Sequence, residues 1–449
     1  MVGPRLWVWW GLLALCASGL LGLGACGGIS GSSAPPPKPQ IQHVVIIFQE
    51  NRTPDNLFQD PNLIAEGADI VDSGTNSSGQ TVPLTPVRLA ISYDIQHSHD
   101  MFLLMYDGGK LDGADKEHVF CPEHDSTCPP PNAEFTSVDA SDVQPYFAMA
   151  EQYTFADRMF QTNQGPSFPA HQFIISGTSA PSAESNLFAS ENISGTTDDG
   201  NSAGCTAPKE AYTFLIDPSG NETKKTYPCF DHPTLTDLLD ARGISWRYYA
   251  PGEGSIWTAP NAISHMRFGS AWNNVILQQT QVLSDIQNGQ LPAVSWVIPS
   301  AQASDHAMSN DGSGPSWVAS IVNAIGNSQY WSNTAIIVAW DDWGGWYDHV
   351  APKILNSYEY GFRVPMIVIS PFAKAHYISH VNHDFGSVLK FVESVFGLPT
   401  VGYADTRADD LSDCFDFSQT PLTFQTIPAK LNAEYFLNDK TPPGPPDDD

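Results

Sequence analysis

Four short runs of apolar, largely β-branched residues constrain the fold of this chain more than any other feature of its sequence. Each run is only five to seven residues long and ends at polar or turn-forming residues. A continuous apolar run of this length is typical of a strand that is buried on both faces of a sheet. The runs are residues 43–48, 294–298, 334–340 and 364–370.

Amphipathic patterns with helical spacing lie between these runs. Buried strands that alternate with helices predict an α/β fold, in which helices cover both faces of a mostly parallel sheet. Segments rich in Gly, Ser, Asn and Pro are expected to form loops or insertions around one end of that sheet. The predicted helices are residues 145–153, 233–242, 316–327 and 385–396, and the predicted insertions are 61–90, 120–140, 181–230 and 250–275.

Polar side chains follow two of the predicted strands directly. Glu50 and Asn51 come after the first run, and Asp341 and Asp342 come after the third. Ligands of open α/β sheets gather at the carboxyl ends of the strands, and a carboxylate near an apolar core is costly unless it is paired or binds a cation. The alternative is that the two aspartates cap the following turn. Because both pairs stand at strand ends, we favour a divalent metal site: oxygen ligands suit Mg²⁺, Ca²⁺ or Mn²⁺, and Fe or Zn once histidines join.

A serine in a rigid turn is the candidate nucleophile. Ser167 lies between Gly165-Pro166 and Phe168-Pro169, which would fix the direction of its hydroxyl. Serine is a weak nucleophile unless a base removes its proton or a metal lowers its pKa, so a nearby metal would serve it. The alternative is an ordinary turn serine. Ser167 does not stand in a Gly-x-Ser-x-Gly elbow, so lipase-type acyl chemistry is not indicated for it.

Several histidines stand next to serines or aspartates in the sequence. They are His97 and His99, His306 after Asp305, and His349 after Asp348. An imidazolium can stabilise a developing phosphorane or protonate a leaving alkoxide. A single histidine is more often a surface residue or a hydrogen-bonded core residue.

The amino-acid composition argues against one class of binding partner. The chain has 449 residues, 41% of them hydrophobic, so most of it can bury a core. Asp and Glu outnumber Lys and Arg by 49 to 20, which gives a formal net charge of -29. Such a surface repels a nucleic-acid backbone, so we expect no nucleic-acid partner.

The first residues predict export. Arg5 precedes an apolar run at 6–23, and Leu23-Gly24-Ala25-Cys26 resembles the bacterial lipobox. We therefore expect a signal peptide at 1–25, a lipid anchor on Cys26 that holds the chain at the membrane of the cell envelope, and a Ser/Pro-rich tether at 26–40. Simple secretion after cleavage near Ala25, or an uncleaved anchor, are the alternatives. The catalytic domain is expected at 41–437 and a disordered acidic tail at 438–449.

Cysteine usage agrees with an oxidising compartment. Outside the leader, Cys121 with Cys128 and Cys205 with Cys229 would each close a short loop, although the sequence does not determine the pairing. The odd cysteine is expected to be Cys414, buried as a small apolar residue.

Taken together, the segments resemble the phosphoesterase family of bacterial acid phosphatases and phospholipases C, within the alkaline phosphatase superfamily. The resemblance runs in order over about residues 41–400. The matching segments are 43–58, 94–97, 108–113, 146–157, 165–167, 304–306, 341–349 and 363–371.

The resemblance implies a mixed α/β sandwich with a divalent cation at the strand ends. It implies that Ser167 attacks phosphorus in a phosphomonoester, phosphodiester or phospholipid, and that water then hydrolyses the phosphoserine. Two further roles follow from the same motifs. The metal ligands would be Glu50, Asn51, Asp341 and Asp342, and the phosphoryl group would be contacted by His97 and His306, with His349 nearby.

Two departures from the family pattern bear on the substrate. Ala170-His171 stands where many relatives carry Asn-Arg, so either His171 replaces a cationic contact or the substrate range differs. The chain also stops soon after the core, where larger phospholipases C continue. A sulfatase would need a Cys- or Ser-x-Pro-x-Arg motif, which the sequence lacks. A surface lipoprotein that keeps the fold for binding alone is the remaining alternative, although the metal carboxylates and the serine are all present.

Overall fold

The computed structural model describes residues 3, 40–195 and 202–445. Its centre is an eight-stranded sheet with the order β14-β13-β15-β1-β16-β17-β8-β18. In that order the strands are Val275–Ile276, Trp246–Tyr249, Val294–Val297, His43–Gln49, Thr334–Trp340, Met366–Ile369, Thr154–Ala156 and Tyr377–Ser379.

Strand β1 lies in the middle of this sheet. It pairs in parallel with β15, where Val44 faces Val294, and with β16, where His43 through Gln49 face Thr334 through Trp340. Strand β17 runs antiparallel to both β16 and β8, and the other neighbouring pairs are parallel. The prediction of a mixed, mostly parallel sheet is therefore confirmed. All four predicted strands form, and β1 from Val44 onward and all of β16 are buried, as their apolar runs require.

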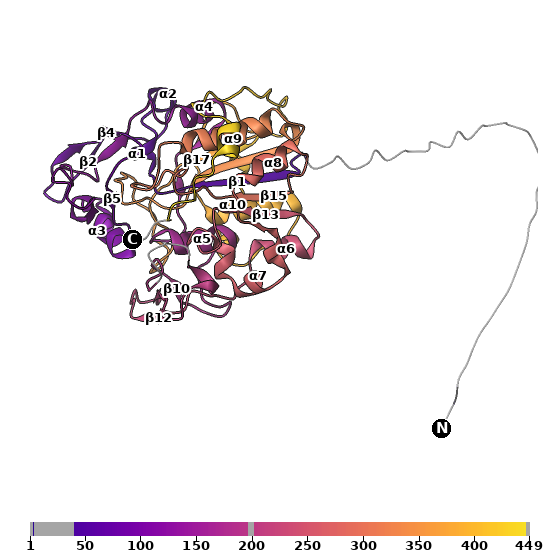
Figure 1. The fold of residues 1–449 in the computed structure, drawn as a ribbon, viewed down its shortest axis with the longest axis horizontal. Helices are drawn as coiled ribbons and strands as arrows, with labels where there is room; N and C mark the ends of the chain where they lie inside the picture. The colour runs from indigo at the N-terminus through magenta and orange to yellow at the C-terminus, as the bar shows by residue number, and fades with distance from the viewer. Residues whose placement is uncertain (1–2, 4–39, 196–201, 446–449) are drawn as a thin grey trace, which may run out of the picture. The chain divides into compact units, whose positions relative to one another are not determined.

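Two groups of helices cover the sheet. Helices α4, α8, α9 and α11 contact one another, and so do α5, α6 and α10. Figure 1 shows α8 and α9 on one side of β1, and α5, α6 and α10 on the other. All four predicted helices form, within two residues of the predicted ends. The helices are Gln144–Gln152 (α4), Ser167–Ser176 (α5), Leu235–Ala241 (α6), Gln281–Gln287 (α8), Gly314–Gly326 (α9), Phe385–Phe396 (α10) and Ala433–Asn438 (α11).

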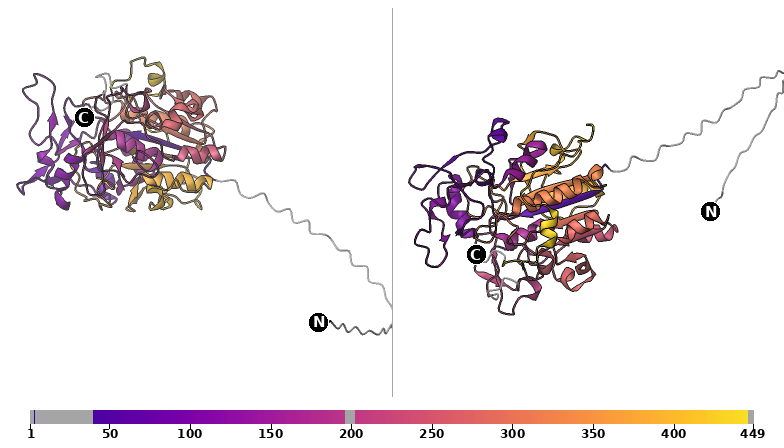
Figure 2. Two further views of the ribbon diagram at one scale, coloured as in Figure 1. Left: turned by 90° about the horizontal axis from the view of Figure 1, so that it is seen from below. Right: turned by 45° about the horizontal axis from the view of Figure 1, so that its top comes forward.

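The predicted insertions 61–90, 120–140 and 181–230 form lobes of short elements beyond one end of the sheet, whereas 250–275 contains α7 and its end contacts β13 and β14. In Figure 1 the lobe with α1 to α3 and the lobe with β10 to β12 lie at the left, where β1 ends, and Figure 2 shows the first lobe from two further directions. They are not simple loops, because short strand pairs satisfy their backbone groups. The remaining strands are 73–75 (β2), 81–83 (β3), 85–87 (β4), 94–95 (β5), 119–120 (β6), 136–138 (β7), 159–160 (β9), 188–189 (β10), 213–216 (β11), 224–226 (β12) and 383–384 (β19); the remaining α-helices are 54–57 (α1), 61–65 (α2), 99–106 (α3) and 264–268 (α7).

Both candidate disulfides are present. Cys121 is bonded to Cys128 and Cys205 to Cys229, while Cys414 is free and buried, as predicted. Disulfides are typical of proteins outside the reducing cytosol, which agrees with an extracytoplasmic location.

The expected signal peptide, Cys26 anchor and tether fall almost wholly outside the described residues. In the part of the chain that the structure describes, no helix is both long and apolar enough to cross a bilayer. Asn438, where the predicted tail begins, is the last residue of α11, and Gly444 N donates a hydrogen bond to Gln302 Oε1 at 3.2 Å.

Candidate active site

The ends of β1 and β16 bring the two predicted acidic pairs together. Because these strands run parallel and in register as far as Gln49 and Trp340, the residues that follow them leave the sheet side by side. Asn51 N donates to Asp341 Oδ1 at 3.0 Å. Glu50, Asn51, Asp341 and Asp342 are all fully buried.

The backbone at Asn51 is held in a conformation that few residues adopt. Its φ is 62°, in the left-handed region that non-glycine residues enter rarely and often at functional sites. Gly344 packs against it so closely that a Cβ there would lie 2.6 Å from the Asn51 Cβ. Gly344 N also donates to Asp342 Oδ1 at 2.8 Å. The Trp-Gly-Gly turn after β16 thus fixes both acidic pairs.

Ser167 meets this cluster from α5. It is the first residue of that helix, and its Oγ donates to Asp342 Oδ2 at 3.0 Å. The next backbone amide, Phe168 N, donates to Asn192 Oδ1 at 2.9 Å, so a side chain from a distant insertion holds the turn. The N-terminus of α5 carries a partial positive charge, which favours an anion such as a phosphoryl group.

His97 is oriented by two hydrogen bonds. Its Nδ1 lies 2.8 Å from Ile95 O, which can only accept, so Nδ1 carries the proton. Nε2 then accepts from Asn51 Nδ2 at 3.1 Å. Nε2 also lies 3.9 Å from Asp342 Oδ2, the oxygen that binds Ser167. The predicted imidazole is therefore fixed beside the candidate nucleophile.

His306 faces His97 from the segment after β15. Their ring centroids are 6.1 Å apart. His306 Nδ1 donates to Ala307 O at 2.6 Å and lies 3.6 Å from Asp94 Oδ2. In their neutral form, His97 and His306 thus both carry the proton on Nδ1. Nε2, on the other side of each ring, carries no proton.

A buried network behind His306 supports it. Asp305 Oδ2 accepts from Tyr146 Oη at 2.8 Å and from Trp340 Nε1 at 3.0 Å. The guanidinium of Arg52 donates to the Asp305 carbonyl at 2.7 Å. Burial raises the pKa of Asp305 to about 6, against the charge of Arg52. Sequence reasoning did not assign these supporting roles, because they depend on contacts between distant segments.

His171 belongs to the carboxylate cluster. Its Nε2 lies 3.2 Å from Glu50 Oε1 and 3.7 Å from Asp341 Oδ2. Burial lowers the pKa of His171 to about 4, although Asp341 opposes the shift. A neutral imidazole supplies no positive charge. The structure therefore disfavours the alternative in which His171 replaces the arginine that many relatives carry. The position suits a metal ligand instead, a role that the sequence pattern did not suggest.

His349 is the one predicted site residue that the structure engages elsewhere. Its Nδ1 lies 2.7 Å from Asp55 Oδ2 and its Nε2 lies 3.0 Å from Asp69 Oδ1. Beside it, Arg363 donates to Asp348 at 2.8 and 2.9 Å. The expectation of a helper near the phosphoryl group is therefore corrected: both ring nitrogens of His349 are used in a separate ion cluster.

A divalent cation fits the carboxylate cluster. Donor atoms of Glu50, His171 and Asp341 all lie within 4.8 Å of one another. Asn51 Oδ1 and Asp341 Oδ2 are buried and have no hydrogen-bond partner among the residues described. A buried polar atom left without a partner costs about 1 to 3 kcal/mol, and coordination to a cation would remove that cost. The oxygen-rich donor set with one imidazole suits Mg²⁺, Mn²⁺, Fe or Zn²⁺.

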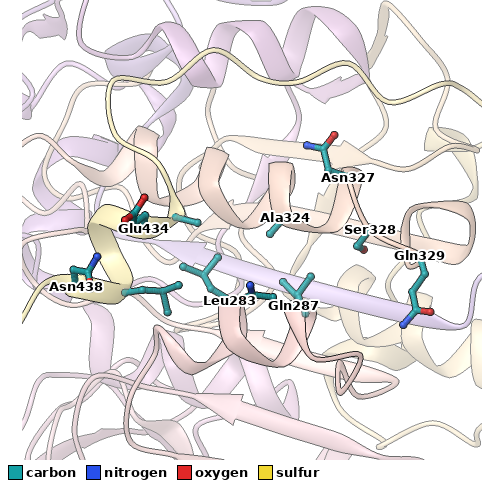
Figure 3. Close-up of a pocket in the computed structure, with 11 residues that line it drawn as sticks. Leu283, Gln287, Ala324, Asn327, Ser328, Gln329, Glu434 and Asn438 are labelled. Atoms are coloured by element: carbon teal, nitrogen blue, oxygen red, sulfur yellow. The ribbon is translucent and has the colours of Figure 1, made fainter.

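A cavity of about 480 Å³ adjoins this cluster. Its lining includes Gln96 and Ser98, which flank His97 in sequence, and Asn192, which holds the Ser167 turn. A second cavity, of about 850 Å³, lies between α8, α9 and α11 and is lined by residues such as Leu283, Asn327 and Glu434 (Figure 3). No predicted site residue lines the second cavity, so it carries no part of the site.

The family model for the phosphoesterase family matches residues 41–399. The chain belongs to this family, as the separated motifs indicated.

Curated relatives agree with the family. Hemolytic phospholipase C of Pseudomonas aeruginosa is 26% identical over 331 residues, which cover 62% of this chain and 42% of the relative. Phospholipase C A of Mycobacterium tuberculosis is 23% identical over 444 residues, which cover 85% of this chain and 78% of the relative. The match therefore spans less than half of the first relative's own length.

Two solved structures show weak likeness to this chain. A protein in the alkaline phosphatase superfamily from Vibrio parahaemolyticus has a TM-score of 0.37 and 11% identity, over 82% of this chain and 70% of that one. The lipoteichoic acid synthase LtaP from Listeria monocytogenes has a TM-score of 0.34 and 8% identity, over 60% and 69%. Scores this low carry no argument about function.

Proposed function

We propose that this chain is an exported, metal-dependent phosphoric-ester hydrolase of the phospholipase C and acid phosphatase type. One observation carries the proposal: the Ser167 hydroxyl donates to Asp342 at 3.0 Å, inside a buried cluster of carboxylates that a cation fits. Family membership supports it independently, since the phosphoesterase match spans both strand ends and the serine turn.

The residues of the chain would divide the chemistry between them. Asp342 holds the proton of Ser167, which leaves a lone pair on Oγ free to attack phosphorus in line. As the alcohol departs, protonated His306 donates a proton to its oxygen, because Nε2 of His97 already accepts from Asn51. Water then attacks the phosphoserine from the side that the alcohol left and gives its proton to the neutral His306, while Asp342 returns its proton to Ser167 Oγ. Peptide dipoles at the start of α5 favour the negative charge that builds on the phosphoryl oxygens.

A bound divalent cation would supply charge neutralisation at those oxygens and would lower the pKa of the serine hydroxyl. Glu50, Asn51, Asp341 and Asp342 would hold it. His171 would be a further ligand, because its donor atom lies within 4.8 Å of those of Glu50 and Asp341. His97 keeps Asn51 aligned for this role. Asn51 Nδ2 donates to the His97 ring, so the amide Oδ1 lies on the side away from that ring.

Phosphomonoesters, phosphodiesters and phospholipids are the proposed substrates. Relatives named as phospholipases C favour a phospholipid, although the match with the first of them covers only 42% of its length. We also propose that the chain is exported and anchored through Cys26, as the lipobox-like sequence indicates. A non-catalytic lipoprotein that keeps the fold for binding remains the competing function.

The Ser167→Ala variant tests the proposal. The variant removes the nucleophile but little volume, so we expect hydrolysis of an aryl phosphate to fall by at least about a thousandfold while the far-ultraviolet circular dichroism stays unchanged. Ser185→Ala, in an insertion, is the matched control and should keep full activity. Undiminished activity in Ser167→Ala, or after exhaustive chelation, would overturn the mechanism.

A substrate panel separates the possible activities. An aryl phosphomonoester, an aryl phosphodiester and phosphatidylcholine vesicles should be assayed side by side with the wild-type chain and Ser167→Ala. Turnover of at least one, lost in the variant, supports an enzyme and identifies its substrate class. No turnover of any of them with every divalent metal tried would favour the binding lipoprotein.

A further inference from the structure

A cluster of different chemistry lies where β19 and the edge strand β18 meet the segment at 409–414. His383 lies in β19, and Asp413 and Cys414 lie in a short 3₁₀ turn at Ser412–Cys414. One donor atom from each of the three lies within 4.8 Å of the other two. We propose that this cluster binds a zinc ion, at a site that shares no residue with the candidate active site.

His383 is oriented as a metal ligand is. Its Nδ1 lies 2.7 Å from Asp409 Oδ2, so a carboxylate holds one side of the ring. The other nitrogen, Nε2, points to Cys414 Sγ at 4.0 Å and to Ser379 Oγ at 3.1 Å. A carboxylate that accepts from the second nitrogen of a ligating histidine recurs in zinc sites, because it fixes the tautomer and makes the ligand more basic.

Cys414 supplies the soft ligand. It is fully buried and free, whereas the other cysteines that the structure describes form disulfides. Burial, with the charges of Asp413 and Asp409, raises the pKa of the thiol, so without a cation it stays protonated. Tetrahedral zinc with bonds of about 2.3 Å to sulfur and 2.0 to 2.1 Å to nitrogen places these two atoms about 3.6 Å apart. A shift of a few tenths of an ångström would therefore reach that geometry.

Asp413 and Ser379 complete the coordination shell. Ser379 Oγ donates to Asp413 Oδ2 at 2.5 Å, and Tyr377 Oη donates to Asp413 Oδ1 at 3.0 Å. Lys374 Nζ, 3.8 Å from Asp413, is partly exposed and can turn to solvent. On binding, the Cys414 thiol releases its proton to solvent and forms the zinc–sulfur bond, while Asp413 and His383 donate lone pairs. Ser379 Oγ or a water takes the fourth position.

The ligand chemistry selects zinc among the divalent cations. A thiolate and an imidazole suit Zn²⁺, whereas Mg²⁺ and Ca²⁺ prefer oxygen donors alone. The site would join β18 and β19 to the turn at Ser412–Cys414, segments that meet only in the folded chain. Bound zinc would therefore stabilise the folded state.

Cobalt substitution tests the site without reference to activity. Co²⁺ added to the purified full chain should produce an intense thiolate-to-cobalt absorption in the near ultraviolet, and equimolar Zn²⁺ should displace it. Cys414→Ser should lose the band. A cation in the active-site cluster cannot give this band, because no cysteine lies among its predicted ligands. Asp413→Asn should weaken the band at least tenfold, and Asp416→Asn, in the same segment, should not.

Two results of the cobalt titration would overturn the proposal. One is the absence of the band in the folded wild-type chain, which would leave only a hydrogen-bonded network. The other is a band that persists in Cys414→Ser, which would assign it to Cys16 or Cys26 of the leader. Zinc should also raise the melting temperature of the wild type more than that of Cys414→Ser, and the circular dichroism of both proteins shows that each is folded. Equal shifts would contradict a zinc–thiolate bond.

Discussion

Two buried clusters in this protein contain the same kinds of residue but are neutralised differently. In one, Asp55, Asp348 and His349 surround Arg363, whose guanidinium donates to both oxygens of Asp348 and to Asp55. In the other, Asp341 faces the imidazole of His171, and its Oδ2 has no hydrogen-bond partner among the described residues.

The difference separates an ion pair from the proposed metal site. Both clusters contain three close donor groups of a kind that can hold a metal. At Arg363 the positive charge is covalently part of the chain, and the donor atoms are already used. At Asp341 the donors converge but are left partly unsatisfied, which is costly unless a cation binds. Convergent ligands therefore indicate a metal only when no buried cationic side chain already fills the role of the cation.

The largest expected effect comes from removing the internal cation. Arg363→Met should lower the free energy of unfolding by about 3 to 5 kcal/mol, because Asp348 and Asp55 would stay buried without compensation. Urea denaturation followed by circular dichroism measures this. Arg88→Met is the control, because its guanidinium is exposed and its partner Asp142 keeps Lys430; it should cost much less than Arg363→Met. Equal losses in the two variants would show that the Arg363 cluster is not specially stabilising.

Neutralising one carboxylate in each cluster should have unequal effects. Asp348→Asn removes the partner of Arg363 and should destabilise the chain by about 2 to 3 kcal/mol. Asp341→Asn in chelator-treated protein should change stability by less than about 1 kcal/mol, because it also relieves repulsion between neighbouring carboxylates. The same urea experiment measures both variants. A large loss from Asp341→Asn without metal would mean that its cluster is already compensated.

The smallest effect is a pH dependence of opposite sign in the two clusters. Burial lowers the pKa of His349, but Asp55 and Asp348 outweigh burial and raise it overall, whereas burial lowers that of His171 to about 4. Stability from His349 is therefore full below pH about 6.5 and lost as pH rises through its folded pKa. Stability from a neutral His171 is full above pH about 6.5 and lost as pH falls towards about 4.

Proton NMR of the imidazoles in chelator-treated protein measures both values. His349→Gln and His171→Gln assign the two resonances and should each flatten the matching limb of the stability profile. Two histidines that titrate together near their ordinary pKa would contradict the electrostatic difference between the clusters.

Much of the site could be predicted from the sequence because it stands at strand ends. The runs that became β1 and β16 have unbroken apolar patterns, so the positions of Glu50 and Asp341 followed from parallel pairing. His349 was misplaced because it follows the same turn as Asp342, and only the fold shows that Asp55 and Arg363 engage it. His171 was considered only as a cationic contact, since no local pattern reveals how deeply an imidazole is buried. The short strands of the insertions were missed because Gly- and Pro-rich segments carry little periodicity.

A titration with Mn²⁺ tests the metal site most directly. Electron paramagnetic resonance measures the concentration of free Mn²⁺ in titrations of chelator-treated wild-type, Asp341→Asn and Asp348→Asn proteins. Circular dichroism shows that each protein is folded. A site with a thiol ligand binds little Mn²⁺, because this cation prefers oxygen ligands. The expected result is saturable binding in the wild type and Asp348→Asn, with affinity at least about a hundredfold lower in Asp341→Asn. Equal binding by the wild type and Asp341→Asn, or no binding by the wild type, would contradict the assignment of the carboxylate cluster as a metal site.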